Sequence, residues 1–357
     1  MRMLMLVVLI VTLTLTAVAQ VKGPSDYSAL PDAPFTAEEI TVQVKTYTLA
    51  GTLLLPKSRT RSLPAVITIT GSGQQTRDEP LALPGLEKYK PMRQIAELLA
   101  GRGIAVLRVD DRGIGSSTGR ETLMAATTSD FADDVRAEVA YLRSRSEIDG
   151  NRIALVGHSE GGTIAPMLAA SDPRIAAIVL MAGAGKSGDL ISMEQLRAVL
   201  DQDTSMTDEQ KKQKLAEEQE VIQAVQTGGD LSKYPAQVRL PWIREFWTYD
   251  PLPTIRKVRQ PILILQGALD RQVSAEQATM LEEAARSAGN KDVTKRIFPN
   301  LNHLFLPAKT GAFSEYTKLE TTAIPDEVIT VLGDWLQTRL KAKENTKARS
   351  FPKNWNQ

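Results

Sequence analysis

The stretch IALVGHSEGG, residues 153–162, decides the fold of this chain. Four apolar residues, typical of a strand buried on both faces, run directly into the pentapeptide Gly-His-Ser-Glu-Gly. A G-x-S-x-G sequence in this position is typical of a sharp strand-to-helix turn that presents the serine hydroxyl in a strained conformation. The residues after it predict a helix whose N-terminal amides favour negative charge near the serine. Ser159 is therefore a candidate nucleophile, unless it merely occupies a tight turn.

Four other stretches share the continuous apolar pattern of a buried strand: PAVITITGSG (64–73), GIAVLRVDDRGIG (103–115), IAAIVLMAGAG (175–185) and PILILQGALD (261–270). Amphipathic helical stretches, such as 89–103 and 129–145, lie between them. This alternation predicts a mostly parallel central sheet flanked by helices. A strand at 293–300 and a helix at 325–340 close the domain.

The segment before these strands has a different pattern. EITVQVKTYTLAGTLLLP (39–56) alternates apolar and polar residues around Ala50-Gly51, which predicts an N-terminal antiparallel hairpin. The proline-containing residues 20–37 predict a linker, so the α/β core is expected at 38–185 and 260–341. Residues 342–357 are expected to form a polar tail.

Residues 186–259 lack the buried-strand pattern and are rich in charged helical stretches. They also contain three closely spaced aromatic residues, Trp242, Phe246 and Trp247. We expect this segment to form a helical cap over the carboxyl edge of the sheet, with the three aromatics in the substrate pocket. The alternative is a passive surface insertion in which the aromatics form the insertion's own core.

The first 19 residues are expected to be a secretory signal peptide. Arg2 precedes an apolar run, and Ala17 and Ala19 have the A-x-A spacing of a cleavage site. The alternative is an uncleaved membrane anchor, but the run is shorter than the ~20 residues that a spanning helix needs. The sequence therefore predicts export to the periplasm or the cell exterior, with no stable membrane association after cleavage.

The composition excludes several classes of function. The chain has 357 residues, a net charge of +1, no cysteine and only two histidines. A near-neutral charge gives no reason to expect a nucleic-acid partner. Without cysteine there is no disulfide, thiolate metal site or cysteine nucleophile. Two histidines, one of them beside Ser159, are a poor metal-ligand set, so neither a metal nor a cofactor is expected.

A serine nucleophile needs a base and an acid. His158 is adjacent to Ser159 and is interpreted as a packing residue of the turn, which leaves His303, after the last predicted strand, as the base. Asp270 follows the preceding strand and completes the chain order Ser, Asp, His. Asp270 could instead cap the helix that begins near Ser274, but Ser274 can supply that cap itself.

The reaction also needs donors for an oxyanion. We expect these to be the backbone N–H groups of Glu160 and Ser72, with Gly73 as an alternative to Ser72. The charged residues around this loop and the next are expected to hold the loops by ion pairing rather than to touch substrate; they are Arg77, Asp78, Glu79, Asp110, Asp111 and Arg112.

Together, the stretches GSGQQTRDE, DDRGIGSSTG, GHSEGG, GALDRQV and NLNH resemble the α/β-hydrolase superfamily over residues 40–340. They are most similar to its bacterial secreted esterase branch, grouped with serine-aminopeptidase-like and dienelactone-hydrolase-like domains. The chain departs from many relatives at Thr70-Gly71, where they have His-Gly. The resemblance implies the α/β-hydrolase fold and a serine hydrolase that acts on a small-molecule substrate.

The leading hypothesis is hydrolysis of carboxylic esters through an acyl-serine intermediate. The aromatic residues of the cap suggest short to medium acyl chains. A peptidase or amidase with the same triad is the main alternative, and an acyltransferase is a variant. A non-catalytic binding module on the same fold is a remote alternative, because such a module would not need to keep Ser159, Asp270 and His303 in order. The sequence leaves the oligomeric state open.

Overall fold

The structure is a computed structural model that describes residues 26–57 and 62–341. The expected signal peptide and polar tail lie outside these residues. The described strands form one sheet in the order β1-β2-β4-β3-β5-β6-β7-β8. Their bounds are β1 Phe35–Gln43, β2 Thr48–Pro56, β3 Leu63–Ile69, β4 Ala105–Val109, β5 Ile148–His158, β6 Ile175–Met181, β7 Ile262–Gly267 and β8 Val293–Phe298. Strands β3 to β8 run parallel, and β1 and β2 are antiparallel to their neighbours.

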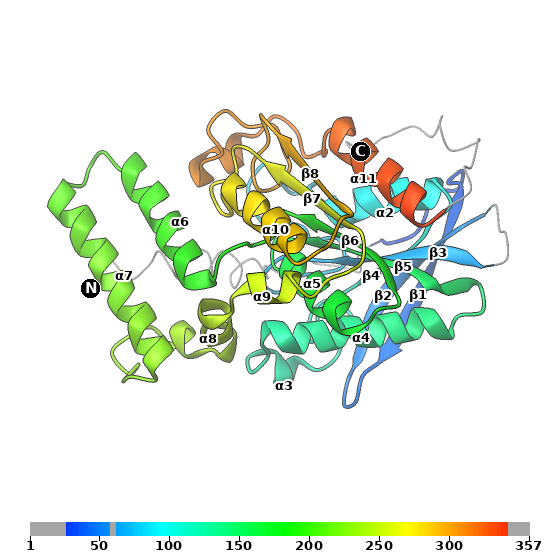
Figure 1. Cartoon of the computed structure of the whole chain (residues 1–357), viewed down its shortest axis with the longest axis horizontal. Helices are drawn as coiled ribbons and strands as arrows, with labels where there is room; N and C mark the ends of the chain where they lie inside the picture. The colour runs from blue at the N-terminus through cyan, green and yellow to red at the C-terminus, as the bar shows by residue number, and fades with distance from the viewer. Residues whose placement is uncertain (1–25, 58–61, 342–357) are drawn as a thin grey trace.

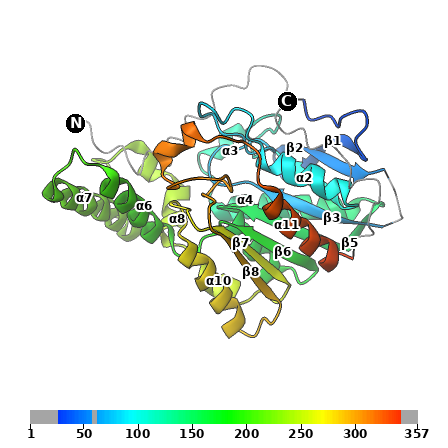
Figure 2. The same ribbon diagram turned by 90° about the horizontal axis from the view of Figure 1, so that it is seen from above.

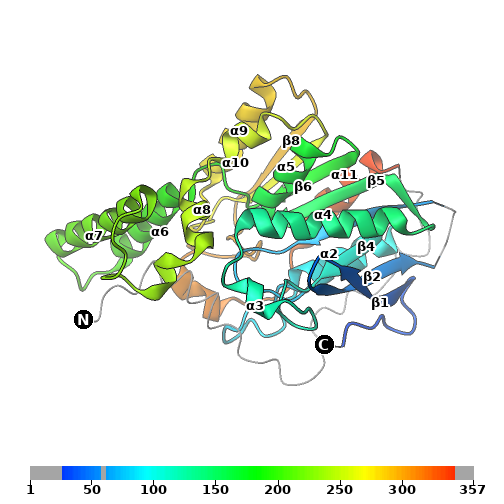
Figure 3. The ribbon, with the colours of Figure 1, turned by 90° about the horizontal axis from the view of Figure 1, so that it is seen from below.

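Helices cover both faces of this sheet. One face packs against α4 (Thr128–Ser144), α5 (Gly161–Ser171) and α10 (Ala275–Ser287). The opposite face packs against α2 (Pro91–Gly101) and α11 (Asp326–Arg339), as Figures 2 and 3 show from two sides. Every residue of β3 and β4 is buried. Strands enclosed in this way need apolar side chains on both faces, which explains their continuous apolar runs. The predicted mostly parallel sheet is confirmed.

The predicted N-terminal hairpin is present, but its turn is not at Ala50-Gly51, the centre of the alternating pattern. The chain turns at residues 44–47, and Gly51 lies within β2, opposite Ile40 of β1 and Val109 of β4. Because β2 pairs on both sides, Gly51 marks a close approach between strands and not a turn. The predicted linker at 20–37 is also too long, because β1 already begins at the buried residue Phe35.

A helical segment lies between β6 and β7, and we call residues 186–259 the cap. It contains α6 (Gly188–Gln202), α7 (Asp208–Thr227), the 3-10 helix η1 (Ala236–Arg239), α8 (Pro241–Thr248) and α9 (Pro251–Ile255). Figure 1 shows α6 and α7 projecting from one end of the molecule, while α8 returns toward the sheet. None of the described helices is long and apolar enough to cross a membrane. The other short helices in the described part of the chain are α3 (Arg120–Leu123) and η2 (Phe313–Lys318).

Candidate active site

The predicted strand-to-helix turn is present at Ser159. Strand β5 ends at His158 and α5 begins at Gly161. Ser159 has φ 53°, in the left-handed region that non-glycine residues rarely adopt. The amide of Ser159 donates to Met181 O at 2.8 Å, which holds the strained backbone in place. A Cβ atom on Gly161 would lie 2.3 Å from Ile69 O, so only glycine fits where the helix meets β3.

The second predicted feature is the pair of His303 and Asp270, which lie after β8 and β7. Their Nδ1 and Oδ2 atoms are 2.8 Å apart, and both side chains are buried. Oδ1 of Asp270 accepts from the amides of Gln272 and Val273, each at 2.8 Å. Gln266, which sequence reasoning missed, donates to Asp270 Oδ2 at 2.8 Å. Asp270 therefore holds its own loop with one oxygen and faces His303 with the other.

Ser274 is the residue before α10, as expected, but its side chain does not cap the helix. Its hydroxyl is buried and has no hydrogen-bond partner among the described residues. The amide of Gln277 donates instead to the backbone carbonyl of Ser274 at 2.9 Å. The position of Ser274 in the sequence therefore identified the start of the helix. It did not identify the atom that accepts from the first helical amides, which is the backbone carbonyl oxygen and not the hydroxyl.

Asn302 shapes the loop that carries His303 and was also missed. Its Oδ1 atom accepts from the amides of Leu304 and Leu306, at 3.0 and 3.1 Å, and its side chain is fully buried. Within this tight loop Phe305 has φ 55°. An asparagine immediately before the candidate base was the available signal, because asparagine side chains commonly accept from amides two residues on.

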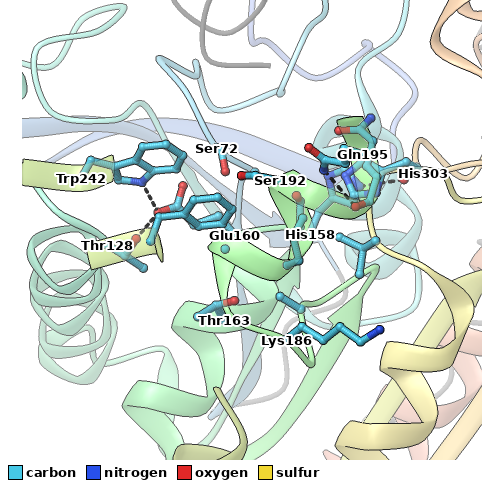
Figure 4. Close-up of a pocket in the computed structure, with 18 of the residues that line it drawn as sticks. Ser72, Thr128, His158, Glu160, Thr163, Lys186, Ser192, Gln195, Trp242 and His303 are labelled. Atoms are coloured by element: carbon cyan, nitrogen blue, oxygen red, sulfur yellow. Dashed lines mark hydrogen bonds between the residues drawn. The ribbon is translucent and has the colours of Figure 1, made fainter. Parts of the chain in front are cut away.

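Ser159 and His303 both line one cavity of about 250 Å³, beneath the cap. Ser72 and Glu160 line the same cavity (Figure 4). Its apolar lining includes Leu81, Leu83 and Leu304. In the described part of the chain, the Ser159 hydroxyl has no hydrogen-bond partner. Such contacts are commonly long in unliganded sites and shorten when substrate binds. The cavity therefore brings the candidate nucleophile and the candidate base together, and Asp270 joins them through its contact with His303.

The candidate oxyanion donors differ in where they face. The amides of Ser72 and Glu160 donate to no acceptor among the described residues, and both residues line the 250 Å³ cavity. The amide of Gly71 is already bonded to Glu79 Oε1, at 2.9 Å. Gly73 lines a separate cavity of about 40 Å³ and does not line the larger one. The geometry favours Ser72 over Gly73.

The side chain of Glu160 also takes part in the site, which sequence reasoning missed because it considered only the backbone. Oε1 of Glu160 accepts from the Trp242 indole N–H at 2.7 Å and from the Thr128 hydroxyl (Figure 4). Burial raises the pKa of Glu160, and hydrogen bonds from Thr128, Trp242 and Ser72 offset only part of that rise. Through Trp242, this carboxyl group joins the cap to the turn that carries Ser159.

The three cap aromatics fit both interpretations of the sequence. Trp242, Phe246 and Trp247 all line the cavity. They also belong to the apolar cluster inside the cap, where Trp247 is 1 % exposed. The rings of Trp242 and Phe246 stack with centroids 5.0 Å apart, and Trp247 Nε1 donates to Ser192 Oγ at 3.0 Å. The same side chains thus form the cap's core and the roof of the cavity.

Ion pairs hold most of the two charged loops, as predicted, but Asp111 forms none among the described residues. Arg77 pairs with Asp110 at 2.8 Å and with Glu39 at 2.7 Å. The other pairs are Arg108 with Asp78 and Arg112 with Asp134, and Asp111 Oδ2 accepts from the amide of Gln75 at 2.9 Å. Glu79 differs from the rest, because it lines the cavity and contacts His158. The described residues contain no group of three or more His, Cys, Asp or Glu side chains placed to hold a metal ion.

Residues 83–308, more than half of the chain, match the family model Hydrolase_4, described as serine aminopeptidase, S33. The chain belongs to the Hydrolase_4 family. This family assignment agrees with the eight-stranded α/β-hydrolase sheet and its serine turn. The predicted fold is therefore confirmed.

The sequence relatives of this Hydrolase_4 chain match only part of it, whereas the similar solved structures cover most of it. It is 37 % identical over 97 residues to the quorum-quenching protein AidA of Acinetobacter baumannii, covering 27 % of this chain and 32 % of AidA. The chain spans about half or less of the length of the curated relatives it matches.

Two solved structures share the fold at low identity. An esterase of Pyrococcus furiosus superposes with a TM-score of 0.57 at 17 % identity, covering 88 % of this chain and 96 % of that one. Est1E of Butyrivibrio proteoclasticus, solved with ferulic acid, gives a TM-score of 0.54 at 17 % identity, covering 85 % and 98 %. At such identities these structures support the fold alone, and the substrate has to be inferred from the residues of the site.

Proposed function

We propose that this hydrolase cleaves carboxylic esters through an acyl-serine intermediate, with Ser159 as nucleophile, His303 as base and Asp270 as the acid that orients His303. The observation that carries the proposal is the buried contact of 2.8 Å between His303 Nδ1 and Asp270 Oδ2, at the edge of the cavity that Ser159 lines. Because the carboxylate accepts the Nδ1 proton, the Nε2 atom of His303 is left free to take a proton.

In the first half of the reaction, Ser159 Oγ attacks the ester carbonyl carbon while His303 Nε2 takes the hydroxyl proton. The amides of Ser72 and Glu160 donate to the oxyanion that forms. His303 then gives its proton to the alcohol oxygen as the carbon–oxygen bond breaks, which leaves acyl-Ser159. Water then attacks the acyl carbon while His303 takes one of its protons. His303 gives that proton to Ser159 Oγ as the bond between the acyl carbon and Oγ breaks, which releases the carboxylic acid and restores Ser159.

The cavity supports small substrates. Its volume of about 250 Å³ is less than the roughly 300–1,000 Å³ of pockets that bind drug-sized ligands. Its walls are mainly apolar, with Trp242, Phe246 and Trp247 from the cap. We therefore propose short to medium acyl chains as substrates.

A peptidase or amidase with the same triad is a second candidate. Two carboxyl groups, those of Glu79 and Glu160, line the cavity, and carboxyl groups are what an aminopeptidase needs near a free substrate amine. The family model's own description also favours this candidate. However, both carboxyl groups already accept hydrogen bonds from the protein, which makes them less available to a substrate.

The test uses purified residues 20–357 with p-nitrophenyl esters from acetate to laurate and, in parallel, aminoacyl p-nitroanilides. We expect the highest kcat/KM on a short or medium ester and labelling of Ser159 by a fluorophosphonate. Ser159→Ala should abolish both activity and labelling, whereas Ser205→Ala, on an exposed turn of the cap, should change neither. Labelling of another serine would refute the mechanism, and a preference for anilides would favour the peptidase.

We also propose export, on the basis of the signal-peptide pattern in residues 1–19. The test is N-terminal sequencing of the mature protein from the periplasm or the culture medium of an expressing bacterium. The expected first residue is Gln20. Recovery of the uncleaved chain only, from the cytoplasm or the membrane, would refute export of a cleaved form.

A further inference from the structure

His158, the histidine beside the nucleophile, joins two loops of the site. Its Nδ1 atom lies 2.7 Å from Glu79 Oε1, and its Nε2 atom lies 2.9 Å from the backbone oxygen of His303. Glu79 and His303 are 79 and 145 positions away from His158 in the sequence. His158 and Glu79 are buried, with side chains 6 % exposed. Figure 4 shows His158 and His303 together on one side of the cavity.

The chemistry of the two partners limits where the protons lie. A backbone carbonyl can only accept, so His158 Nε2 must carry a proton. Oε1 of Glu79 also accepts from the amide of Gly71, at 2.9 Å, so this oxygen acts as an acceptor in the site. Nδ1 of His158 then carries a proton as well, and the ring is an imidazolium. Neither ring nitrogen is left to act as a base toward Ser159.

The electrostatics agree with this assignment. Burial alone would lower the pKa of His158, but the Glu79 carboxylate and the His303 carbonyl outweigh burial, and the net pKa is raised. The groups that face or neighbour this contact are the carboxylate of Asp270, the ring of His303 with its centroid 5.0 Å away, the edge-on ring of Phe305, and the hydroxyl of Tyr89 near Glu79.

At one end, the contact reaches the loop with the proposed oxyanion donor. Gly71, bonded to Glu79, immediately precedes Ser72. A Cβ atom on Gly71 would lie 2.8 Å from Glu79 Oε1 and 3.1 Å from Ser159 Cβ, so the loop lies close against both. Glu79 itself has φ 55°, a strained conformation that the ion pairs of Arg77 and Asp78 help to hold.

At the other end, the contact reaches the proposed base. The His158 ring donates to the peptide oxygen of His303, while Asp270 holds the His303 ring through Nδ1. The backbone and the ring of the base therefore have separate attachments. The backbone is tied to the oxyanion loop through His158 and Glu79, and the ring is tied to the loop after β7.

We propose that His158, as an imidazolium paired with Glu79, is a positioning residue that sets the distance between the oxyanion donor Ser72 and the base His303. The proposal rests on the proposed triad. A donor or base displaced by about 1 Å can cost about 100-fold in rate, so a brace between the two loops has a direct kinetic consequence. It also explains why a histidine beside the nucleophile does not compete with His303.

The first test measures the imidazole nitrogens of the wild-type protein by NMR. The chain has only two histidines, so a 15N-histidine sample gives two ring systems, which His158→Asn assigns. We expect both nitrogens of His158 to stay protonated between about pH 6 and pH 8. In Glu79→Gln, His158 should lose its charge and show a single protonated nitrogen at about pH 8. A neutral His158 ring at about pH 7 in the wild type would overturn the proposal, whatever the enzyme's substrate.

The second test uses kinetics to separate the two contacts of His158, with Glu79 and with the His303 carbonyl. The amide nitrogen of asparagine in His158→Asn approximates Nδ1 and can reach Glu79, whereas that of glutamine in His158→Gln approximates Nε2 and can reach His303 O. Because neither variant makes both contacts, we expect each to lower kcat about 10- to 100-fold with little change in KM. Glu79→Gln should do the same, and the double variant with His158→Gln should be no slower than the slower single variant.

The matched control is Glu218→Gln, which changes a buried carboxyl group in the cap, away from both loops, and should leave kcat unchanged. Full kcat in either His158 variant would overturn the proposal that His158 positions the two loops. So would a double variant whose loss in kcat equals the product of the two single losses. If Ser159→Ala retained activity, the proposed triad would fail instead, while the NMR result would still report the charge of His158. The two failures are therefore distinguishable.

Discussion

His303 Nδ1 lies 2.8 Å from Asp270 Oδ2, although the two residues are 33 positions apart. The carboxyl group is fully buried and receives four hydrogen bonds, from His303, Gln266 and the amides of Gln272 and Val273. Both oxygens of Asp270 therefore act as acceptors. The site is built so that the His303 ring has one orientation and one tautomer.

Asp270→Asn should therefore lower kcat by about 10³- to 10⁴-fold, because the asparagine NH2 group would face His303 Nδ1 and favour the wrong tautomer. The measurement is steady-state hydrolysis of the best p-nitrophenyl ester. Asp292→Asn, which changes a part-exposed carboxyl group paired with Arg339, is the control and should keep wild-type kcat. A loss of less than tenfold in Asp270→Asn would argue that another acid orients His303.

Arg77→Met should destabilise the fold strongly. The Arg77 side chain is fully buried and bonded to Asp110, Glu39 and Thr52, and its removal leaves the buried carboxylate of Asp110 without its cation. Breaking such a pair costs about 3–5 kcal/mol. Urea unfolding measures the loss. Arg136→Met, which removes an exposed pair with Asp133, should cost under about 1 kcal/mol. Equal costs would mean that Asp110 is solvated or finds another partner.

Glu160→Gln should raise stability above neutral pH. Burial raises the folded-state pKa of Glu160, so its contribution to stability is full below the unfolded value and is lost as pH rises through the folded value. Glutamine keeps an acceptor for Trp242 and Thr128 without a charge to desolvate. In thermal melts we expect a higher Tm at about pH 8 than wild type, and a difference that shrinks toward pH 4. A lower Tm at pH 8 would mean that the carboxylate is well solvated.

Trp242→Phe tests the same link from the cap side. It removes the indole N–H that donates to Glu160 and keeps an aromatic ring in contact with Phe246. A hydrogen bond to a charged group contributes about 1.5–3 kcal/mol, and one to a neutral group about 0.5–1.5 kcal/mol. Above neutral pH, urea unfolding should therefore show a smaller cost for Trp242→Phe in the Glu160→Gln background than in the wild type. Equal costs in both would show that Glu160 is neutral in the native protein.

The cap should be pH-sensitive through Glu218 on α7. Burial raises the pKa of Glu218 to about 7, and its Oε1 atom has no hydrogen-bond partner among the described residues. Stability from this group is present below pH 4.5 and is lost as pH rises through 7, on the order of 3 kcal/mol in all. Glu218→Gln should therefore melt at a higher temperature than wild type at about pH 8.5, and the difference should be much smaller near pH 5. The exposed control Glu209→Gln should show no such pH dependence.

The predictable parts of the site were those encoded by neighbouring residues. The apolar run into G-H-S-E-G marked the turn at Ser159, since a buried strand, a tight turn and a helix each have a local pattern. Asp270 and His303 could be proposed because each follows a strand, and because the chain offers only two histidines. Gly51 was misread, because an alternating pattern and a glycine cannot distinguish a turn from a strand that pairs on both sides.

The sequence by itself determined the order of strands and helices, the strained serine and the absence of a cysteine nucleophile, all of which depend on composition and short spacing. Only the tertiary structure decided that the two ring nitrogens of His158 bond to Glu79 and to the His303 carbonyl. It also decided that the Glu160 carboxyl group joins Trp242 to the turn. Those contacts depend on how distant segments meet at the carboxyl edge of the sheet. No local spacing encodes where a side chain points once 79 or 145 residues of folded chain separate it from its partner.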